Sequence, residues 1–123
     1  RARKWVTYLK NDFSVPKVYG EIDKSEIVFV SWGSTKGIIL EAQKQLNSKG
    51  KETAFIHFNH IYPLDTKKVT ELLKQNKKYI LIENNSWGQF GKLLRMETGI
   101  EIKNKILRYD GRPITAEEII KKL

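Results

Sequence analysis

Apolar and polar residues alternate in blocks along this chain, and the sharpest boundary between two blocks lies before Gly33. Residues 27–32 read I-V-F-V-S-W and lead directly into the polar, glycine-bracketed G-S-T-K-G. Apolar residues then recur at helical spacing through Asn47. This order is typical of a buried parallel strand that enters a helix through a tight turn. We therefore expect Glu26–Trp32 to be a central strand, followed by a helix over Lys36–Asn47.

Two further strand–helix units follow with the same pattern. The predicted strands are Thr53–Asn59 and Tyr79–Glu83. The predicted helices run from the N-cap Asp65 through Asn76, and from about Gly88 to Glu97, while Lys49-Gly50 and Gly99 are placed to end helices. The residues expected to face the core are Ile39, Ala42, Gln43, Leu46, Val69, Leu72, Leu73, Phe90, Leu93 and Leu94. Strands that alternate with helices predict an α/β fold, with a parallel sheet covered on both faces.

The two ends of the chain carry shorter signals. Residues 1–14 place four apolar side chains at helical spacing, which predicts an entry helix or linker from a preceding domain. Val15–Gly20 contains a proline and suits an extended edge strand. Lys105–Tyr109 reads as a last strand, and Thr115–Glu118 as a capping box that opens a terminal helix burying Ile119, Ile120 and Leu123. We predict one compact domain over residues 15–123.

Composition narrows the class of protein. Forty per cent hydrophobic and 30% charged residues in 123 positions are typical of a globular domain. No apolar run approaches the roughly 18 residues that a membrane span needs. The absence of cysteine excludes a disulfide scaffold and thiolate-bound zinc or iron–sulfur sites within this chain, and cytoplasm is the default location. The start at Arg1 leads us to expect a piece of a longer chain.

The formal net charge of +9 is the strongest signal in the composition. It fits a nucleic-acid surface, an anionic ligand or an acidic protein partner. The lysines are scattered, however, and no aromatic residues interleave with them as a base-stacking surface would require. A solvated lysine-rich surface is therefore favoured over nucleic-acid binding.

Polar corners follow the predicted strands, and parallel strands place such corners at one edge of the sheet. Open α/β sheets bind ligands at this edge, where the strand order reverses. The corner after the strand that ends at Trp32 and the corner after the strand that ends at Glu83 flank that point. They supply the candidate residues for interdomain contact or anion binding, which are Gly33, Ser34, Thr35, Lys36, Gly37, Glu83, Asn84, Asn85 and Gln89. These residues could instead have structural roles, and there are two such alternatives. Ser34 or Thr35 would cap the helix, and Glu83 with its amide neighbours would hydrogen-bond adjacent loops.

No set of residues forms a complete catalytic site. His57 and His60 are the only histidines, and three positions apart on a strand they point to opposite faces, unlike two ligands of one metal. The corner Gly33–Gly37 matches neither the Walker loop nor G-x-G-x-x-G, and no G-x-S-x-G elbow is present. The residues therefore predict no catalytic group and no metal site.

Four motifs at these corners resemble the carboxy-terminal region of the alpha subunit of 2-oxoacid:ferredoxin oxidoreductases, and most closely the 2-oxoglutarate type. They are S-W-G-S-T-K-G (31–37), H-I-Y-P-L (60–64), E-N-N-S-W-G-Q-F (83–90) and Y-D-G-R-P-I-T-A-E-E-I (109–119). The resemblance implies a three-layer α/β/α domain like the transketolase carboxy-terminal domain. Its five-stranded mixed sheet would have the order 1-3-2-4-5, with strand 1, at Val15–Tyr19, antiparallel.

The resemblance also implies a role. The whole enzymes oxidatively decarboxylate a 2-oxoacid to an acyl-CoA and reduce ferredoxin, using thiamine diphosphate, magnesium and iron–sulfur clusters. Since this chain has no thiamine signature and no cluster ligand, we expect a non-catalytic domain that packs against other alpha-subunit domains and the beta subunit. Ferredoxin and CoA would be partners of the whole complex only. The alternative is a free-standing basic α/β module that binds nucleic acid or an anionic small molecule.

Overall fold

The computed structural model describes residues 16–59, 65–84, 88–108 and 112–123. Five strands form one sheet: β1 (Lys17–Tyr19), β2 (Ile27–Trp32), β3 (Thr53–Phe58), β4 (Lys78–Glu83) and β5 (Asn104–Leu107). The strand order is β1-β3-β2-β4-β5. β1 pairs antiparallel with β3, and the other three pairs are parallel. The predicted order, the central place of β2 and the antiparallel edge strand are confirmed.

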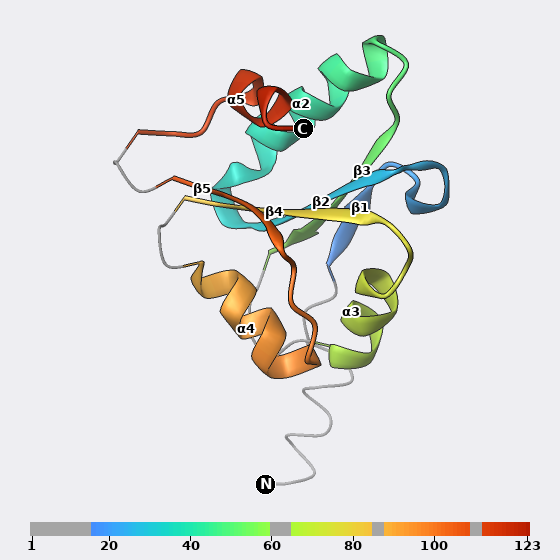
Figure 1. The fold of residues 1–123 in the computed structure, drawn as a ribbon, viewed down its shortest axis with the longest axis vertical. Coiled ribbons are helices and arrows are strands. Elements are labelled where there is room, and N and C mark those ends of the chain that lie inside the picture. The colour runs from blue at the N-terminus through green and yellow to red at the C-terminus, as the bar shows by residue number, and fades with distance from the viewer. Residues whose placement is uncertain (1–15, 60–64, 85–87, 109–111) are drawn as a thin grey trace, which may run out of the picture.

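Helices cover both faces of this sheet (Figure 1). The helices α2 (Lys36–Ser48) and α5 (Ala116–Lys121) lie on one face, while α3 (Thr66–Leu73) and α4 (Gln89–Thr98) lie on the other. Short 3₁₀ turns, η1 (Ile22–Lys24) and η2 (Gly33–Thr35), flank β2. The three-layer α/β/α architecture follows from strands that carry apolar side chains on both faces.

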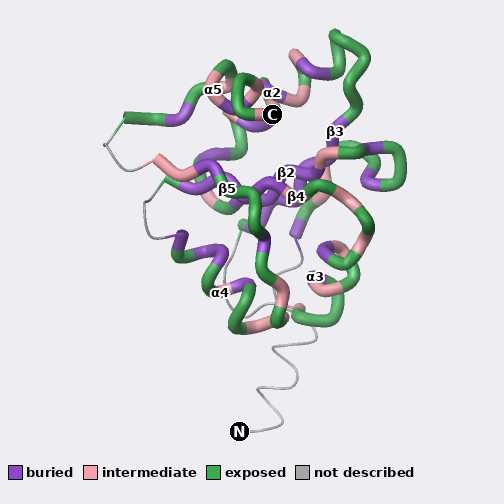
Figure 2. The backbone as a smooth tube through the Cα atoms, in the orientation of Figure 1, coloured by how far each residue is buried: buried purple, intermediate pink, exposed green. Residues whose placement is uncertain are grey.

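The core is divided by the sheet into two apolar layers. The α2/α5 layer contains Phe29, Ile39, Phe55, Ile82 and Ile119, and each is fully buried. The α3/α4 layer contains Val30, Ile56, Phe58, Phe90 and Leu94 on the opposite side. Buried positions accordingly concentrate in the strands and on the inner faces of the helices (Figure 2). Alternate residues of β3 enter opposite layers, as the period of a strand requires.

Helix ends follow the predicted signals closely. Asp65 Oδ1 accepts a hydrogen bond from Lys68 N at 3.2 Å and caps α3. Thr115 and Glu118 form the predicted capping box of α5. Gly99 has φ 76° and its N–H bonds Arg95 O, which closes α4 in the left-handed conformation.

Some boundaries differ from the predicted ones. The helix α3 ends at Leu73 and not at Asn76, because Tyr79 Oη accepts a hydrogen bond from Gln75 N in a non-helical turn. β5 begins one residue earlier than predicted and ends at Leu107. Leu72, Leu93, Ile120 and Leu123 are only partly buried. The predicted entry helix and the residues His60 and Tyr109 lie outside the described residues, and no helix among those that are described is long and apolar enough to cross a membrane.

Candidate functional site

The corners after β2 and β4 come together at the carboxyl edge of the sheet. A pocket of about 280 Å³ lies between them and is lined by Trp32, Gly33, Ser34, Thr35, Glu83 and Asn84. β2 and β4 are hydrogen-bonded neighbours while β3 lies on the other side of β2, so this is the point where the strand order reverses. The structure thus brings together five of the nine candidate residues. Lys36, Gly37 and Gln89 are not among the lining residues, and Asn85 lies outside the described ranges.

Glu83 is the buried acid of this pocket, with 1% of its surface exposed. Its two carboxylate oxygens accept hydrogen bonds from Phe90 N at 2.9 Å and Gly91 N at 3.1 Å. These N–H groups belong to the first turn of α4, where a helix has no internal acceptors and a negative charge is stabilised by the helix dipole. Glu83 therefore joins the end of β4 to the start of α4, which confirms the structural alternative for this residue.

Ser31 and Thr35 hold the other side of the pocket. Ser31 Oγ donates to Ile82 O at 2.6 Å and also shares a hydrogen bond with the Thr35 hydroxyl. Thr35 in turn donates to Trp32 O at 3.2 Å. Thr35 is the N-cap of α2 but makes no side-chain cap bond. The prediction that Ser34 or Thr35 caps this helix is therefore wrong for Thr35, because a 3₁₀ turn, Gly33–Thr35, precedes the helix and directs its hydroxyl to the strand.

Lys36 lies on the far side of β2 from Glu83. Its Nζ is 5.4 Å from the centre of the Tyr19 ring, and Lys17 Nζ is 5.2 Å from the same ring. The pocket therefore contains the carboxylate of Glu83 but not the lysine that the sequence placed beside it. This arrangement does not favour an anion between the two corners.

His57 forms a hydrogen bond with the turn Gly33–Thr35 that follows β2. It is 3% exposed, and its Nε2 donates to Gly33 O at 2.9 Å. Its Nδ1 is buried and has no hydrogen-bond partner among the described residues. The described residues contain no group of three or more His, Cys, Asp or Glu side chains that could hold a metal ion. His57 is thus part of the packing of the corner.

Trp32 is the residue that the sequence did not single out. It ends β2, lines the pocket and is 38% exposed, with its ring 6.2 Å from that of Phe90. Trp32 and Met96 are the large hydrophobic residues in the described part of the chain that are exposed. Tryptophan is enriched among the residues that contribute most to binding at protein interfaces. An aromatic residue directly before a polar corner was the available signal.

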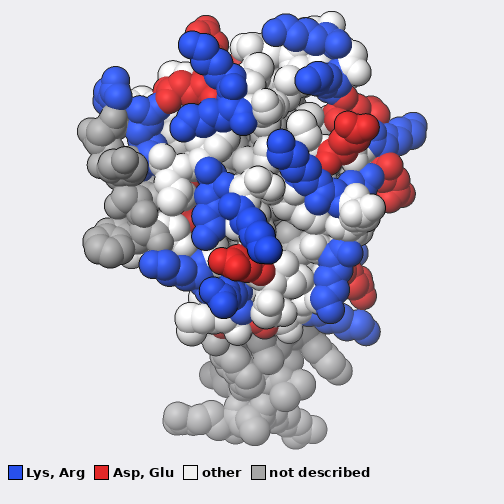
Figure 3. Space-filling view, in the orientation of Figure 1, with Lys and Arg blue, Asp and Glu red and all other residues white. Residues whose placement is uncertain are grey.

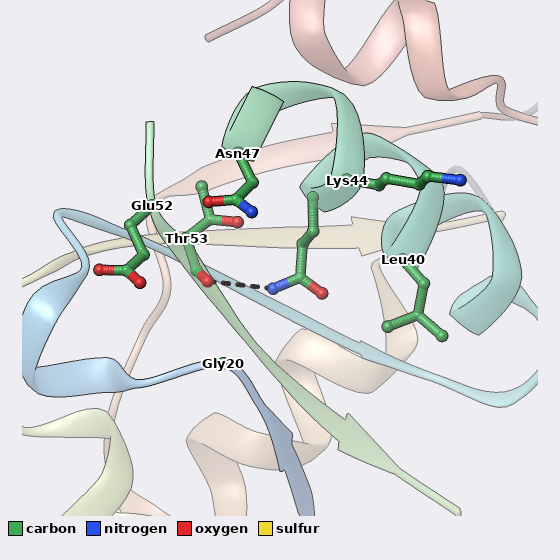
Figure 4. A pocket seen from close by; sticks show the side chains of 7 residues that line it. Gly20, Leu40, Lys44, Asn47, Glu52 and Thr53 are labelled. Carbon is green, nitrogen blue, oxygen red and sulfur yellow. Dashed lines mark hydrogen bonds between the residues drawn. The ribbon is translucent and has the colours of Figure 1, made fainter. Parts of the chain in front are cut away.

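A second pocket, of about 290 Å³, lies between α2 and the start of β3 (Figure 4). Gln43 Nε2 donates to Tyr19 O at 3.2 Å and to Thr53 O at 3.1 Å, which fixes this side chain in the fold. The charged side chains of Lys44 and Glu52 extend away from each other (Figure 4). They do not converge on a common ligand position, so this pocket is a weaker candidate.

The charged surface is mixed. On the face shown in Figure 3, lysine and arginine side chains alternate with aspartate and glutamate and form no continuous basic stripe. Nucleic-acid binding needs a positive surface that follows the phosphate backbone. The mixed distribution on this face therefore favours a solvated surface.

Comparisons with known proteins identify a family and several relatives that are similar to this chain. The family described as transketolase, C-terminal domain, matches residues 18–94. The alpha subunit of 2-oxoacid:ferredoxin oxidoreductase 1 from Aeropyrum pernix is 36% identical over 114 residues, which are 91% of this chain and 18% of that subunit. The matching subunit from Saccharolobus solfataricus is 35% identical over 102 residues, which are 83% of this chain and 16% of that subunit. This chain therefore spans less than a fifth of these curated relatives.

Two solved structures are also similar. The alpha chain of a probable 2-oxoacid ferredoxin oxidoreductase from Thermoplasma acidophilum is 36% identical, with a TM-score of 0.60, and the match covers 86% of this chain and 90% of that one. A 2-oxoglutarate:ferredoxin oxidoreductase from Magnetococcus marinus, with 2-oxoglutarate, coenzyme A and succinyl-CoA bound, has a TM-score of 0.83 at 24% identity. That match covers 94% of this chain and 20% of that chain, and it shows the shared fold.

Proposed function

Since this chain belongs to the transketolase C-terminal domain family, we propose that it is a structural and interface domain of a 2-oxoacid:ferredoxin oxidoreductase alpha subunit. The whole complex would oxidatively decarboxylate a 2-oxoacid, of the 2-oxoglutarate type, to an acyl-CoA and reduce ferredoxin in the cytoplasm. The observation that carries the proposal is the 36% identity to the Thermoplasma acidophilum alpha chain, 90% of which this chain covers.

The cofactors of that reaction are assigned to other domains or subunits. This chain has no cysteine and so no thiolate for an iron–sulfur cluster. In the described ranges no three His, Cys, Asp or Glu side chains are grouped as metal ligands. We therefore assign no chemical step to this domain.

The partners would be the other domains of the alpha subunit and the beta subunit, while ferredoxin and CoA would interact with the whole complex. The hydrogen bonds and the exposure of the residues that line the pocket between β2 and β4 support an interface there. Glu83 and Ser31 are engaged in hydrogen bonds within the fold, while Trp32, Ser34 and Asn84 are exposed at the surface. We therefore propose Trp32, Gly33, Ser34 and Asn84 as contact residues for a neighbouring domain, with Trp32 as the anchor.

The test uses the complete alpha subunit purified with its beta subunit. Trp32→Ala should weaken domain packing or subunit association, because truncating an interface tryptophan commonly costs about 2 kcal/mol or more. Met96→Ala is the matched control, since Met96 is also an exposed apolar residue, 81% exposed, but lies on α4 outside the pocket. Analytical ultracentrifugation and turnover per assembled complex are measured.

The expected result is dissociation at a higher protein concentration for Trp32→Ala, with normal turnover in the complexes that remain assembled. Circular dichroism of the variant subunit separates this outcome from unfolding. Normal association of the Trp32→Ala subunit would contradict the interface. Lost turnover in a fully assembled complex would contradict the non-catalytic role.

A further inference from the structure

Three polar side chains gather at the edge of the sheet, away from the pocket between β2 and β4. Lys17 and Tyr19 belong to β1, and Lys36 is the first residue of α2. Lys17 Nζ lies 5.2 Å and Lys36 Nζ 5.4 Å from the centre of the Tyr19 ring. Two ammonium groups from separate elements therefore converge on one phenol. We call these three residues the Lys17–Tyr19–Lys36 cluster.

The two lysines give this cluster a positive charge. Within the described residues neither lysine has a carboxylate oxygen within 4.0 Å, whereas Lys24, Arg95 and Arg108 each form an ion pair. A hydrogen bond with Lys36 and the charge of Lys17 lower the pKa of Tyr19, with the Lys36 bond as the larger cause. The lack of a paired carboxylate among the described residues and the lowered pKa of Tyr19 both indicate that the site favours negative charge on an oxygen atom.

The backbone around the cluster adds to this preference. The 13-residue helix α2 begins at Lys36, and its first turn contains no acidic residue. The partial positive charge of a helix N-terminus therefore adds to that of the two lysines. His57 lies directly opposite Lys17 in the pairing of β1 with β3, and its buried Nδ1 has no partner among the described residues. The charged groups that act on Tyr19 are both lysines.

We propose that the Lys17–Tyr19–Lys36 cluster is a binding site for a doubly charged oxyanion of the phosphate type. Two ammonium groups and one hydroxyl supply two positive charges and three donor groups, which match a dianion with three acceptor oxygens. A carboxylate carries one charge and leaves one ammonium group unbalanced. The inference is independent of the role proposed for the whole subunit, because it concerns a different surface of the domain.

The probe is inorganic phosphate, added to the isotope-labelled 123-residue chain at pH 7.5 and constant ionic strength. We expect saturable changes in the NMR signals of the Tyr19 ring and the Lys36 amide. Lys17→Gln and Lys36→Gln should each weaken binding roughly fivefold, as expected for the loss of one exposed charge-assisted contact. Lys44→Gln, on the exposed side of the same helix, is the matched control and should bind as the unchanged chain does.

A second readout tests the position of the anion. Bound phosphate would neutralise the lysines around Tyr19, so the pKa of Tyr19 should rise toward its ordinary value when phosphate is saturating. Acetate at the same ionic strength should not reproduce the saturable change. Equal responses to phosphate and acetate, or an unchanged affinity in both lysine variants, would overturn the proposal, since either result reflects general ionic screening.

Discussion

The carboxylate of Glu83 accepts a hydrogen bond from the backbone N–H of Phe90 at 2.9 Å. The bond joins the last residue of β4 to the second residue of α4 across residues 84–89, of which 85–87 lie outside the described ranges. Gly91 N donates to the second oxygen of the same carboxylate at 3.1 Å. One buried side chain thus satisfies two donors of a helix start and fixes the edge of the sheet where the pocket lies.

The first prediction concerns this carboxylate. Glu83→Gln should lower the free energy of unfolding by about 2–3 kcal/mol, because the amide group would place a donor against one of the two N–H donors. Urea denaturation of the chain measures the change. Glu71→Gln, an exposed acid on α3, should stay within about 0.5 kcal/mol. Equal stability of the Glu83 variant would mean that the helix start is held by other contacts.

The second prediction concerns the close approach of α4 to β4. A Cβ added at Gly91 would lie 2.6 Å from Leu81 Cδ2, in the fully buried α3/α4 layer. Gly91→Ala should therefore destabilise the domain by about 1–3 kcal/mol, although alanine is the better helix former. Gly37→Ala is the matched control, because its Cβ would meet nothing within 4 Å, and it should stabilise by about 0.5 kcal/mol. Thermal unfolding of both variants measures the change in stability. A stabilised Gly91→Ala variant would contradict the prediction and show that the Leu81 side chain can move to make room.

The third prediction separates two serines of the same corner. Ser31 is fully buried and donates to Ile82 O, whereas Ser34 is exposed. Ser31→Ala should cost about 1–3 kcal/mol, since the Ile82 carbonyl would remain buried without this donor. Ser34→Ala should leave urea unfolding nearly unchanged. A similar loss in both variants would mean that the corner depends on Ser34 in a way that its exposure does not indicate.

The fold could be predicted from the sequence because its signals are local and agree with one another. Apolar runs of strand length, Asp65, the Thr115–Glu118 box and Gly99 each determine a boundary through short-range contacts. The sheet order came from the resemblance, and the structure confirms it. The boundary at Leu73 was missed because Tyr79, which bonds the turn after α3, lies in the next strand.

The candidate site was predicted less completely. That Gly33–Thr35 and Glu83–Asn84 meet follows from topology alone, since both end neighbouring strands. The direction of the Lys36 side chain does not follow from topology, because it depends on the Tyr19 ring, which is 17 residues away on the edge strand β1. Trp32 was counted only as strand, since a strand pattern does not show which terminal side chain remains exposed.

The fourth prediction uses the ionisation of Tyr79. Its Oη donates to Leu72 O at 2.6 Å and accepts from Gln75 N at 3.2 Å, so the neutral phenol holds the end of α3. Burial raises the pKa of Tyr79 above its ordinary value of 10.0. The folded state therefore keeps this proton at a pH where the unfolded chain has begun to lose it, and the contribution to stability decreases as pH rises above about 10. Tyr79→Phe removes both the hydrogen bonds and this titration.

Tyr79→Phe should lower the free energy of unfolding by about 1 kcal/mol at pH 7, where the phenol is neutral in both states. The difference from the unchanged chain should become smaller between pH 9 and roughly pH 11, because only the unchanged chain loses the Tyr79 contribution there. Urea denaturation at several pH values measures both curves, and comparison of the two removes the titration of lysines that they share. A difference that grows with pH would have the opposite sign, and would mean that the folded state favours the ionised phenol.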